Sequence, residues 1–266
     1  MMRILAFLLL TLSLALSGCG LLPDQIDETR DWSASKLYSR AKEALNGGNY
    51  TQAVRYFEKL EARFPYGPYA QQAQLEIAYA YYKDNEPISA IAACDRFIKL
   101  HPNHPHVDYA YYLKGLANFV EDNNLLARLG KQDMSERDPS AARESFEAFR
   151  ELVERFPDSR YTPDAAARMR YLVNALAAHE VHVARHYLKR GAHVAAVNRG
   201  KYVLEHYQNS PAVEEALAIM MQAYARMGLN DLSADTRRVL QHNFPNSPWL
   251  SGAGPAPVGK AWWRFW

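Results

Sequence analysis

Small residues recur along the chain at positions that predict paired helices. Seven residues after each of them stands a larger apolar residue, and an offset of seven is two helical turns, so both side chains share one helix face. The small residues are Ala53, Ala90, Ser145, Ala196 and Ser233, and their larger partners are Leu60, Phe97, Leu152, Val203 and Leu240. Successive small residues are separated by 37, 55, 51 and 37 positions. The pattern predicts a repeated helical unit with two enlarged copies.

Turn and stop signals flank the predicted helices. Residues that tolerate a left-handed backbone at a helix end stand five positions before four of the small residues. They are Gly48, Asn85, Gly191 and Gly228. Prolines, which end helices because they lack an N–H and restrict the residue before them, stand twelve positions after four of the small residues. They are Pro65, Pro102, Pro157 and Pro245, and the fourth unit has Gln208 instead. Each unit is therefore helix, tight turn, helix and stop.

This arrangement is similar to the tetratricopeptide repeat, in which a small residue lets the two helices of a unit approach each other. The first two units match best, through Ala41, Ala53, Phe57 and Pro65, and through Ala78, Tyr81, Ala90 and Pro102. We expect an all-α solenoid of about five such units between about residues 31 and 250. A solenoid of this kind leaves a long concave groove, which is a binding surface rather than a reaction centre.

The third unit contains the first insertion. Its extra residues lie between Gly115 on the first helix and Ser145 on the second. We expect a loop over about 120–138, after which Asp138 is the N-cap and Pro139 the first residue of the next helix.

The fourth unit contains the second insertion. Ala184 and Ala196 keep the ordinary spacing, so the extra residues precede Ala184 and lengthen the first helix by about four turns, from near Pro163 to Arg190. This helix would separate N-terminal repeats at 31–162 from C-terminal repeats at 163–250.

The N-terminus has the features of a lipoprotein signal. Arg3 precedes an apolar run from Ile4 to Leu16, which is too short to span a bilayer. Leu16-Ser17-Gly18-Cys19 follows and resembles a bacterial lipobox. The resemblance implies a cleaved signal peptide at 1–18, an S-diacylglycerol and N-acyl lipid on Cys19, and a tether over 19–30. An ordinary secretory peptide cleaved near Gly18 is the alternative.

Composition agrees with a folded body on that anchor. The chain has 266 residues, of which 48% are hydrophobic, and a formal net charge of +2. Nucleic acid is not an expected partner, because its binding needs clustered lysine and arginine and the charges here alternate in sign. Cys94 is the second of two cysteines. If Cys19 is acylated, no disulfide can form, and Cys94 is best interpreted as a small buried apolar residue.

Catalytic and metal-binding patterns are weak. His179, His182 and His186 share a face of the long helix, but Val183 stands where a zinc protease needs glutamate. A solvated helix face is the better interpretation. His101, His104 and His106 are expected in a turn between units, and no nucleophile elbow, phosphate loop or cysteine pair occurs. We expect no enzyme, metal or cofactor other than the lipid; a zinc-dependent hydrolase is the rival hypothesis.

Three segments resemble one family of tetratricopeptide lipoproteins. They are Phe64-Pro65-Tyr66-Gly67-Pro68-Tyr69, then Asp95-Arg96-Phe97-Ile98 with Pro102, His104 and Pro105, and Arg190-Gly191-Ala192 with Asn198 and Arg199. Together with the lipobox they resemble the BamD family of the outer-membrane β-barrel assembly machinery. Gly20 after the acylated cysteine, in place of aspartate, also favours the outer membrane, and we expect the chain on its periplasmic side.

The resemblance implies partners and two binding surfaces. The partners are the POTRA domains of the barrel subunit BamA, other assembly lipoproteins, and unfolded β-barrel substrates with aromatic C-terminal signals. The groove for these signals would be lined by Tyr69, Tyr79, Tyr82, Tyr109 and Tyr112. Packing between helices is the alternative role of the tyrosines. Arg190, Asn198 and Arg199 would form the contact with the barrel subunit, where Arg199 would meet a carboxylate; a solvated helix charge is its alternative.

The C-terminal segment 251–266 is a linker of Gly, Pro and Ala followed by Ala261-Trp262-Trp263-Arg264-Phe265-Trp266. We expect this aromatic tail to pack on a partner, on the bilayer interface, in the tyrosine groove or against the last repeat.

For the protein as a whole, the alternative function is that of a lipid-anchored repeat scaffold for the assembly of a pilus or the cell wall.

Overall fold

The computed structural model describes residues 27–119 and 139–251, and within them it is all helical, as expected. Ten α-helices and one short 3-10 helix follow one another along these two segments. Their bounds are α2 Ala34–Asn46, α3 Tyr50–Arg63, α4 Pro68–Lys83, α5 Pro87–Leu100, α6 Val107–Asn118, α8 Ser140–Arg155, α9 Thr162–Lys189, α10 His193–His206, α11 Ala212–Arg226, α12 Asn230–Asn243 and η3 Pro248–Ser251.

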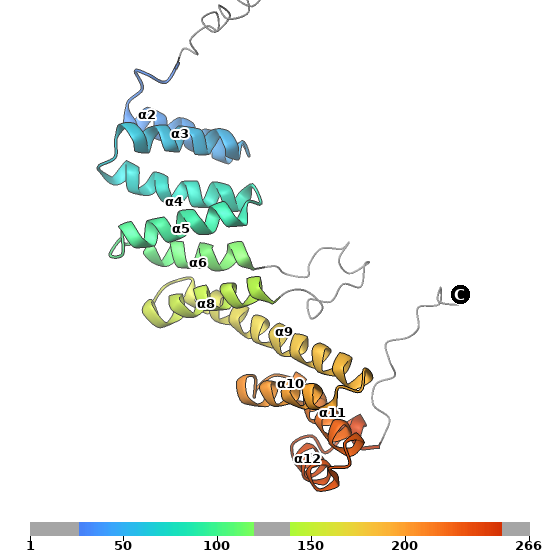
Figure 1. Cartoon of the computed structure of the whole chain (residues 1–266). Coiled ribbons are helices and arrows are strands. Elements are labelled where there is room, and N and C mark those ends of the chain that lie inside the picture. Colours follow the sequence, from blue (N-terminus) through green and yellow to red (C-terminus); the bar gives the residue numbers. More distant parts are fainter. Residues whose placement is uncertain (1–26, 120–138, 252–266) are drawn as a thin grey trace, which may run out of the picture.

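The helices pair in chain order and stack into a single array (Figure 1). The five pairs are α2 with α3, α4 with α5, α6 with α8, α9 with α10, and α11 with α12. First helices of successive units also contact each other, at α2 and α4, at α4 and α6, and at α9 and α11. Among the described helices, the second helices of successive units have no contacts as extensive as these. The first helices therefore line the inner side of the stack, as in other helical solenoids.

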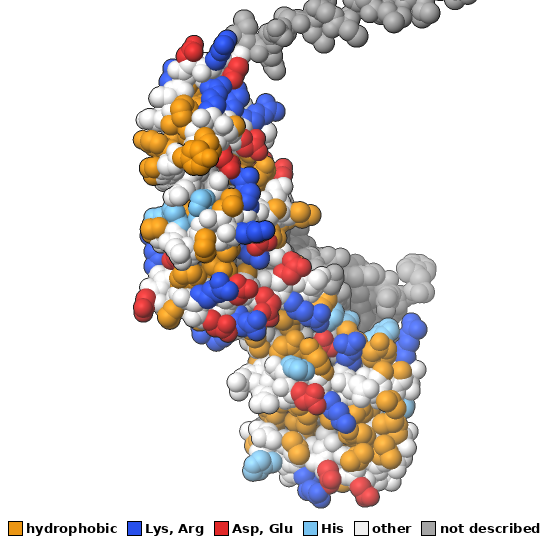
Figure 2. Space-filling model, turned by 60° about the vertical axis from the view of Figure 1, so that its left-hand side comes forward, with side chains coloured by type: hydrophobic (Ala, Val, Ile, Leu, Met, Phe, Trp, Pro, Cys, Tyr) orange, Lys and Arg blue, Asp and Glu red, His pale blue; other side chains and the backbone are white. Residues whose placement is uncertain are grey.

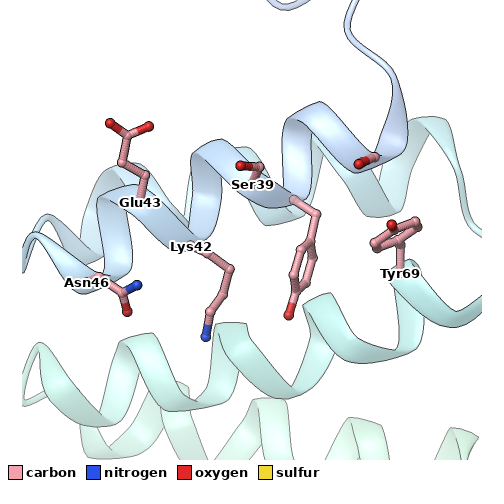
Figure 3. Close-up of a pocket in the computed structure, with 7 residues that line it drawn as sticks. Ser39, Lys42, Glu43, Asn46 and Tyr69 are labelled. Atoms are coloured by element: carbon pink, nitrogen blue, oxygen red, sulfur yellow. The ribbon is translucent and has the colours of Figure 1, made fainter.

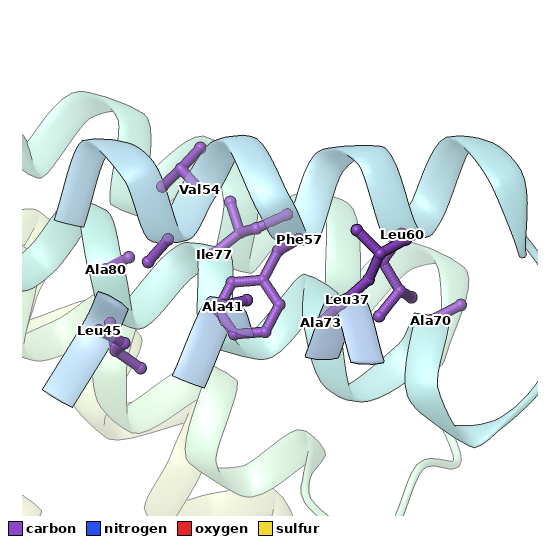
Figure 4. Packing of buried hydrophobic residues seen from close by; sticks show 11 residues of the cluster. Leu37, Ala41, Leu45, Val54, Phe57, Leu60, Ala70, Ala73, Ile77 and Ala80 are labelled. Carbon is purple, nitrogen blue, oxygen red and sulfur yellow. The ribbon is translucent and has the colours of Figure 1, made fainter. Parts of the chain in front are cut away.

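The repeated positions have the burial that their spacing predicted. The small residues of the first four units and the apolar residue seven positions after all five are fully buried. Ser233, in the last unit, is half-buried and donates a hydrogen bond to the Met221 carbonyl at 3.0 Å. In the first unit, Phe57 and Leu60 of α3 meet Leu37 of α2 and Ile77 of α4 in one cluster (Figure 4). The two-turn offset thus marks the core face of every second helix.

The predicted turns are confirmed. Gly48, Asn85, Gly191 and Gly228 all have positive φ, between 60° and 78°. The residue before each of the four repeat prolines is the C-cap of a second helix. A left-handed residue inside the unit and a proline after it therefore terminate the helices at the expected places.

The two helices of the third unit come close at Gly115. Ser145 on α8 donates its hydroxyl hydrogen to the Gly115 carbonyl on α6 at 2.9 Å, in a buried contact. A Cβ on Gly115 would lie closer than 3.0 Å to three ring carbons of Phe149, which is itself fully buried. Two small residues therefore set the separation of these helices.

Helix α9 takes part in two hydrophobic clusters. Its N-terminal half contributes Ala165 and Leu172 to the core shared with α5, α6 and α8. Its C-terminal half contributes Val181 and Leu188 to the core shared with α10 and α11. The 28-residue helix, about 42 Å long at 1.5 Å per residue, is the long first helix expected from near Pro163 to Arg190.

The start of α8 differs from the expectation. The helix begins at Ser140 with Pro139 as its N-cap, so Pro139 precedes the helix instead of occupying its first position. The Pro139 carbonyl accepts the first helical hydrogen bond, from Arg143 N, which makes it a cap by its backbone alone. Asp138, the loop 120–138, the signal peptide, Cys19 and residues 252–266 lie outside the described residues.

The segment before α2 is fastened to α3. Lys59 donates to the Asp27 carboxylate at 2.6 Å, and Arg63 binds the Thr29 carbonyl and side chain. The hydrogen bond from Lys59, followed by the one that the Thr29 hydroxyl donates to the same carboxylate, holds the pKa of Asp27 well below its usual range. Residues 27–30, expected to belong to the tether, are therefore fixed to the first unit.

Two further observations concern the described segments. Cys94 is fully buried, and burial raises the pKa of its thiol to about 12, which agrees with its expected role as an apolar residue. None of the described helices combines the length and the hydropathy needed to cross a bilayer.

We predict that Gly115→Ala destabilises the fold. Helix propensity alone favours alanine by about 1 kcal/mol, but overpacking a core costs about 1–3 kcal/mol, and here the added methyl group meets the Phe149 ring. Urea unfolding should therefore give a net loss of about 1 kcal/mol. The same substitution in a Phe149→Leu background should lose less or gain stability. A stabilising effect of Gly115→Ala in the wild-type background would contradict the close approach.

Candidate functional site

A groove of about 630 Å³ lies between the first helices of the N-terminal units and the turns that precede α6 and α9. Its wall contains three tyrosines, Tyr79, Tyr109 and Tyr161. The remaining lining residues are Lys42, Pro68, Gln71, Gln72, Leu75, Glu76, His104, Pro105, His106 and Arg160. Figure 2 shows hydrophobic and histidine side chains side by side on this part of the N-terminal units. The groove thus combines aromatic faces, amides and both signs of charge.

A second pocket, of about 600 Å³, adjoins this groove through Lys42. It lies between α2 and α4, and Figure 3 shows Lys42 and Tyr69 in the gap between these helices. Lys42 Nζ lies 2.8 Å from Glu76 Oε1, and the Tyr38 hydroxyl donates to the same oxygen at 3.3 Å. The Tyr38 and Tyr69 rings are 5.4 Å apart. Lys42 is therefore neutralised by a neighbour and bridges the two hollows.

The aromatic wall continues beyond the groove. Tyr161 lies between Tyr109, at a ring separation of 5.4 Å, and Tyr112, on which it stacks at 4.7 Å. The Arg160 guanidinium lies 4.8 Å from the centre of the Tyr161 ring. Its hydrogen bond to the Tyr161 hydroxyl is the main reason that the pKa of Arg160 is raised. Arg160 therefore remains a cation at the rim of the groove.

The phenols of Tyr109 and Tyr112 remain protonated at neutral pH. Burial raises the pKa of Tyr109 above its usual range. Burial, together with the hydrogen bond to Asp164 at 2.7 Å, raises the pKa of Tyr112 to about 12. Neutral phenols donate hydrogen bonds, so Tyr109 offers an apolar face and a donor to a ligand.

The turn histidines form one edge of the groove. The His106 N–H donates to His104 Nδ1 at 3.1 Å, which requires that nitrogen to be unprotonated. Burial, followed by repulsion from His106 and His101, lowers the pKa of His104. His101 Nε2 lies 2.9 Å from the side-chain oxygen of Gln74. Two of the three expected turn histidines, His104 and His106, thus also line the groove, whereas His101 does not.

Not all five expected tyrosines share the groove. Tyr79 and Tyr109 line it, and Tyr69 lies in the adjoining pocket. Tyr82 lines a separate pocket with Leu116 and Phe119, and Tyr112 is bonded to Asp164. Tyr82 follows Tyr79, and Tyr112 follows Tyr109, by about one helical turn. This advance along the helix places the side chains of Tyr82 and Tyr112 beyond the end of the groove.

Of the residues that line the groove, sequence reasoning assigned only Tyr79 and Tyr109 to it. The lining residues that it did not assign include Tyr161, Arg160 and Lys42. Arg160 and Tyr161 precede α9, far along the chain from α4, and they reach the groove only because α8 reverses the chain direction. Nothing in the identity of Arg160 or Tyr161, or in their neighbours along the chain, indicates that they lie at the groove. The sequence shows that the histidines stand beside Pro102 and Pro105. It does not show that this turn lies next to Tyr79 and Tyr109.

The three expected interface residues lie around the turn between α9 and α10. Arg190 is the C-cap of α9 and is exposed, and Asn198 is exposed on α10. Arg199 is engaged within the chain, since its Nη1 donates to Glu180 Oε2 at 2.8 Å. That hydrogen bond is the main cause of the raised pKa of Arg199. Arg199 is therefore more than a solvated charge, because it pairs with the buried side chain of Glu180.

The described residues contain no cluster of three or more His, Cys, Asp or Glu side chains that could hold a metal ion. His179, His182 and His186 do lie along α9, where they were expected.

Comparison with known proteins identifies the family. The model of a family described as an outer membrane lipoprotein, YfiO, matches residues 30–250. The outer membrane protein assembly factor BamD of Neisseria meningitidis serogroup A is 52% identical over 262 residues, which cover 97% of this chain and 98% of that protein. BamD of Vibrio cholerae is 37% identical over 235 residues, covering 88% of this chain and 96% of that protein.

Among solved structures, the MamA protein has a TM-score of 0.34 and 15% identity, over 85% of this chain and 98% of the MamA chain. The assignment of the repeats rests on the helix pairs described above. The family and protein matches extend across all five units, and they associate the chain with the outer membrane. The chain belongs to the BamD family of outer-membrane protein assembly factors.

Proposed function

We propose that the chain is a non-catalytic subunit of the outer-membrane protein assembly complex. In this role it docks on the POTRA domains of the barrel subunit, alongside other lipoproteins, and receives the C-terminal signals of unfolded β-barrel proteins. A lipid on Cys19 holds it on the periplasmic side of the outer membrane. The observation that carries the proposal is 52% identity to an assembly factor over 97% of the chain. The groove and the α9–α10 turn supply the two surfaces that this role needs.

The groove suits an extended peptide that ends in an aromatic residue. Tyr79, Tyr109 and Tyr161 offer ring faces, and Gln71 and Gln72 offer amides to a peptide backbone. The terminal carboxylate of the peptide needs a cation. Lys42 is already paired with Glu76, so Arg160, whose guanidinium lies over the rim tyrosine, is the better partner.

We predict that Tyr109→Ala weakens the binding of a peptide with a C-terminal aromatic residue. The loss should be about tenfold or more, because a ring that lines the groove is removed. Tyr82→Ala is the matched control, since Tyr82 is half-buried but lines a different pocket. Fluorescence anisotropy with a labelled peptide measures both affinities, and thermal melting verifies the fold. Equal effects of the two substitutions would argue against this groove.

The docking surface is best probed away from Arg199. Replacing Arg199 by glutamate would place a second carboxylate against buried Glu180 and disturb the junction of α9 and α10. A loss of binding in that variant would therefore not distinguish an interface from a folding defect. Arg190 and Asn198 are exposed, and changes there test the interface alone.

We predict that Arg190→Glu and Asn198→Glu abolish recovery of a POTRA-bearing barrel protein when the acylated chain is pulled down from detergent-solubilised outer membranes. Arg190→Glu reverses a charge and Asn198→Glu introduces a negative one, and both changes oppose docking because the partner surface is complementary in charge. Arg238→Glu on α12 is the control, because its side chain is 76% exposed and lies outside the proposed surface. Mass spectrometry identifies the recovered proteins.

One result of this pull-down would reject the proposed function, and another would reject only the proposed docking surface. Recovery of pilus or cell-wall components by the wild type would favour a scaffold for another envelope assembly. Equal recovery of the barrel protein by the wild type and by both interface variants would keep the assembly function but move the docking surface elsewhere.

A further inference from the structure

The chain just before α2 is held on α3 by a dense set of hydrogen bonds. Residues 27–32, called the strap below, contain a carboxylate, a hydroxyl and a carbonyl that bind the same two cations. Lys59 Nζ donates to Asp27 Oδ1 at 2.6 Å and to the Thr29 hydroxyl at 3.3 Å. Arg63 donates to the other Asp27 oxygen, to the Thr29 carbonyl and, at 3.1 Å, to the Thr29 hydroxyl. Thr29 is only 4% exposed, so this contact belongs to the packed structure of the first unit.

The strap is also fixed within itself and at its far end. Asp27 Oδ1 accepts the Thr29 N–H at 3.1 Å, and the Arg30 N–H donates to the Asp27 carbonyl at 2.9 Å. The Trp32 ring packs against the core of the first unit, with its centre 5.7 Å from that of Tyr56 on α3. The strap is therefore attached at both ends, by ion pairs at Asp27 and by an aromatic contact at Trp32.

The strap occupies the place of a preceding unit. Lys59 on α3 and Arg96 on α5 stand 37 positions apart, which is the spacing of the first two units. Arg96 pairs with Glu61 of α3 at 2.7 Å and so joins the second helices of two successive units. No described unit precedes the first, and Lys59 pairs with Asp27 instead. Terminal units of a solenoid need a polar outer face, and the strap completes that face.

The position of the strap limits how far the chain can extend from Cys19. Eight residue steps separate Cys19 from Asp27, and at about 3.5 Å per residue they span at most about 28 Å. Without the contact on α3, the first fixed residue would be Trp32, and thirteen steps would span about 45 Å. The groove lies on the units next to this end of the stack, so its distance from a membrane that holds Cys19 depends on the same limit.

We propose that the strap is a stop for the lipid tether. Lys59 and Arg63 hold it on α3, so the pull of the anchor acts on the first unit at Asp27 and the groove stays close to the membrane surface. This inference rests on the proposed function, which places a lipid on Cys19 and substrate peptides in the groove. It gives Asp27, Lys59 and Arg63 a role in positioning that groove.

The first experiment measures hydrogen exchange of the strap in the acylated chain, bound to vesicles of phosphatidylethanolamine and phosphatidylglycerol. Asp27→Ala removes the carboxylate that both cations share, so the backbone amides of 29–32 should exchange about tenfold faster than in the wild type. Asp31→Ala is the matched control, since Asp31 is an exposed acidic residue of the same strap, and its exchange should equal that of the wild type. Equal exchange in Asp27→Ala and the wild type would reject the proposal, because the contact would then not hold the strap.

The second experiment measures the distance of the first unit from the membrane. Time-resolved energy transfer runs from a dye at Glu43→Cys to acceptor lipids in the same vesicles. The Glu43 side chain is 68% exposed at the end of α2, whereas Cys94 is fully buried and is not labelled. In Asp27→Ala the distances should extend beyond the wild-type limit by up to about 17 Å, the length of five residues.

Two changes of tether length keep this test independent of folding. A five-residue Gly-Ser insertion between Gly20 and Leu21 leaves the strap intact and should extend the distances as much as Asp27→Ala does. Deleting residues 21–25 from Asp27→Ala should restore the wild-type limit. Melting temperatures of all variants verify folding.

The outcomes separate this inference from the proposed function. If the wild type does not remain on the vesicles, the lipid anchor of the proposed function fails. If the wild type remains there but Asp27→Ala leaves the distances unchanged, the stop is rejected and the proposed function stands. Extended distances that the shortened tether does not restore would also reject the stop, because the substitution would then act through the fold of the first unit.

Discussion

Close contact between the two helices of each unit is the constraint on which the rest of the molecule depends. A solenoid has no central core, so each unit is stable only by burying the faces of its own helix pair and of its neighbours. Ala53, Ala90 and Ala196 are fully buried at these contacts, and in the third unit Ser145 and Gly115 allow the approach. The contact holds the first helices side by side, and their exposed surfaces form the groove.

Helix α9 connects the two parts of the protein to which binding roles are assigned. Its first turns continue the core beneath Tyr161, at the groove, and its last turns lead to Arg190, at the proposed docking surface. Between these ends, Glu180 ties α9 to α8 and α10. A continuous helix of 28 residues, tied to α8 and α10 at Glu180, therefore connects the groove with the proposed docking surface.

Local rules account for what the sequence predicted. Repeat spacing, prolines and left-handed turn residues act within about one unit, so they gave the helix pairs, the long α9 and the buried positions. Pro139 was misplaced by one residue because its backbone carbonyl, rather than a side chain, caps α8. The groove was only partly predictable from the sequence. Arg160 and Tyr161 lie near Tyr79 because the units stack on one another, and no local sequence pattern indicates that proximity.

Glu180 was visible in the sequence but was not recognised. It stands in register with Leu176, Ala177, Val181 and Ala184, all buried on one stripe of α9. A carboxylate on such a stripe requires a partner of opposite charge, because an unpaired charge is costly to bury. The identity of that partner depends on α8 and α10, which no local pattern relates to residue 180.

The most direct test of the account is the folding of outer-membrane β-barrels in cells depleted of this chain. Folded barrels migrate differently from unfolded ones in unheated detergent gels, so the folded fraction can be followed by immunoblot during depletion. The account predicts that several unrelated barrels lose their folded form and that the wild-type chain restores it, whereas a Cys19→Ala chain does not. Undiminished barrel folding after complete depletion would contradict the central claim that this protein supports outer-membrane protein assembly.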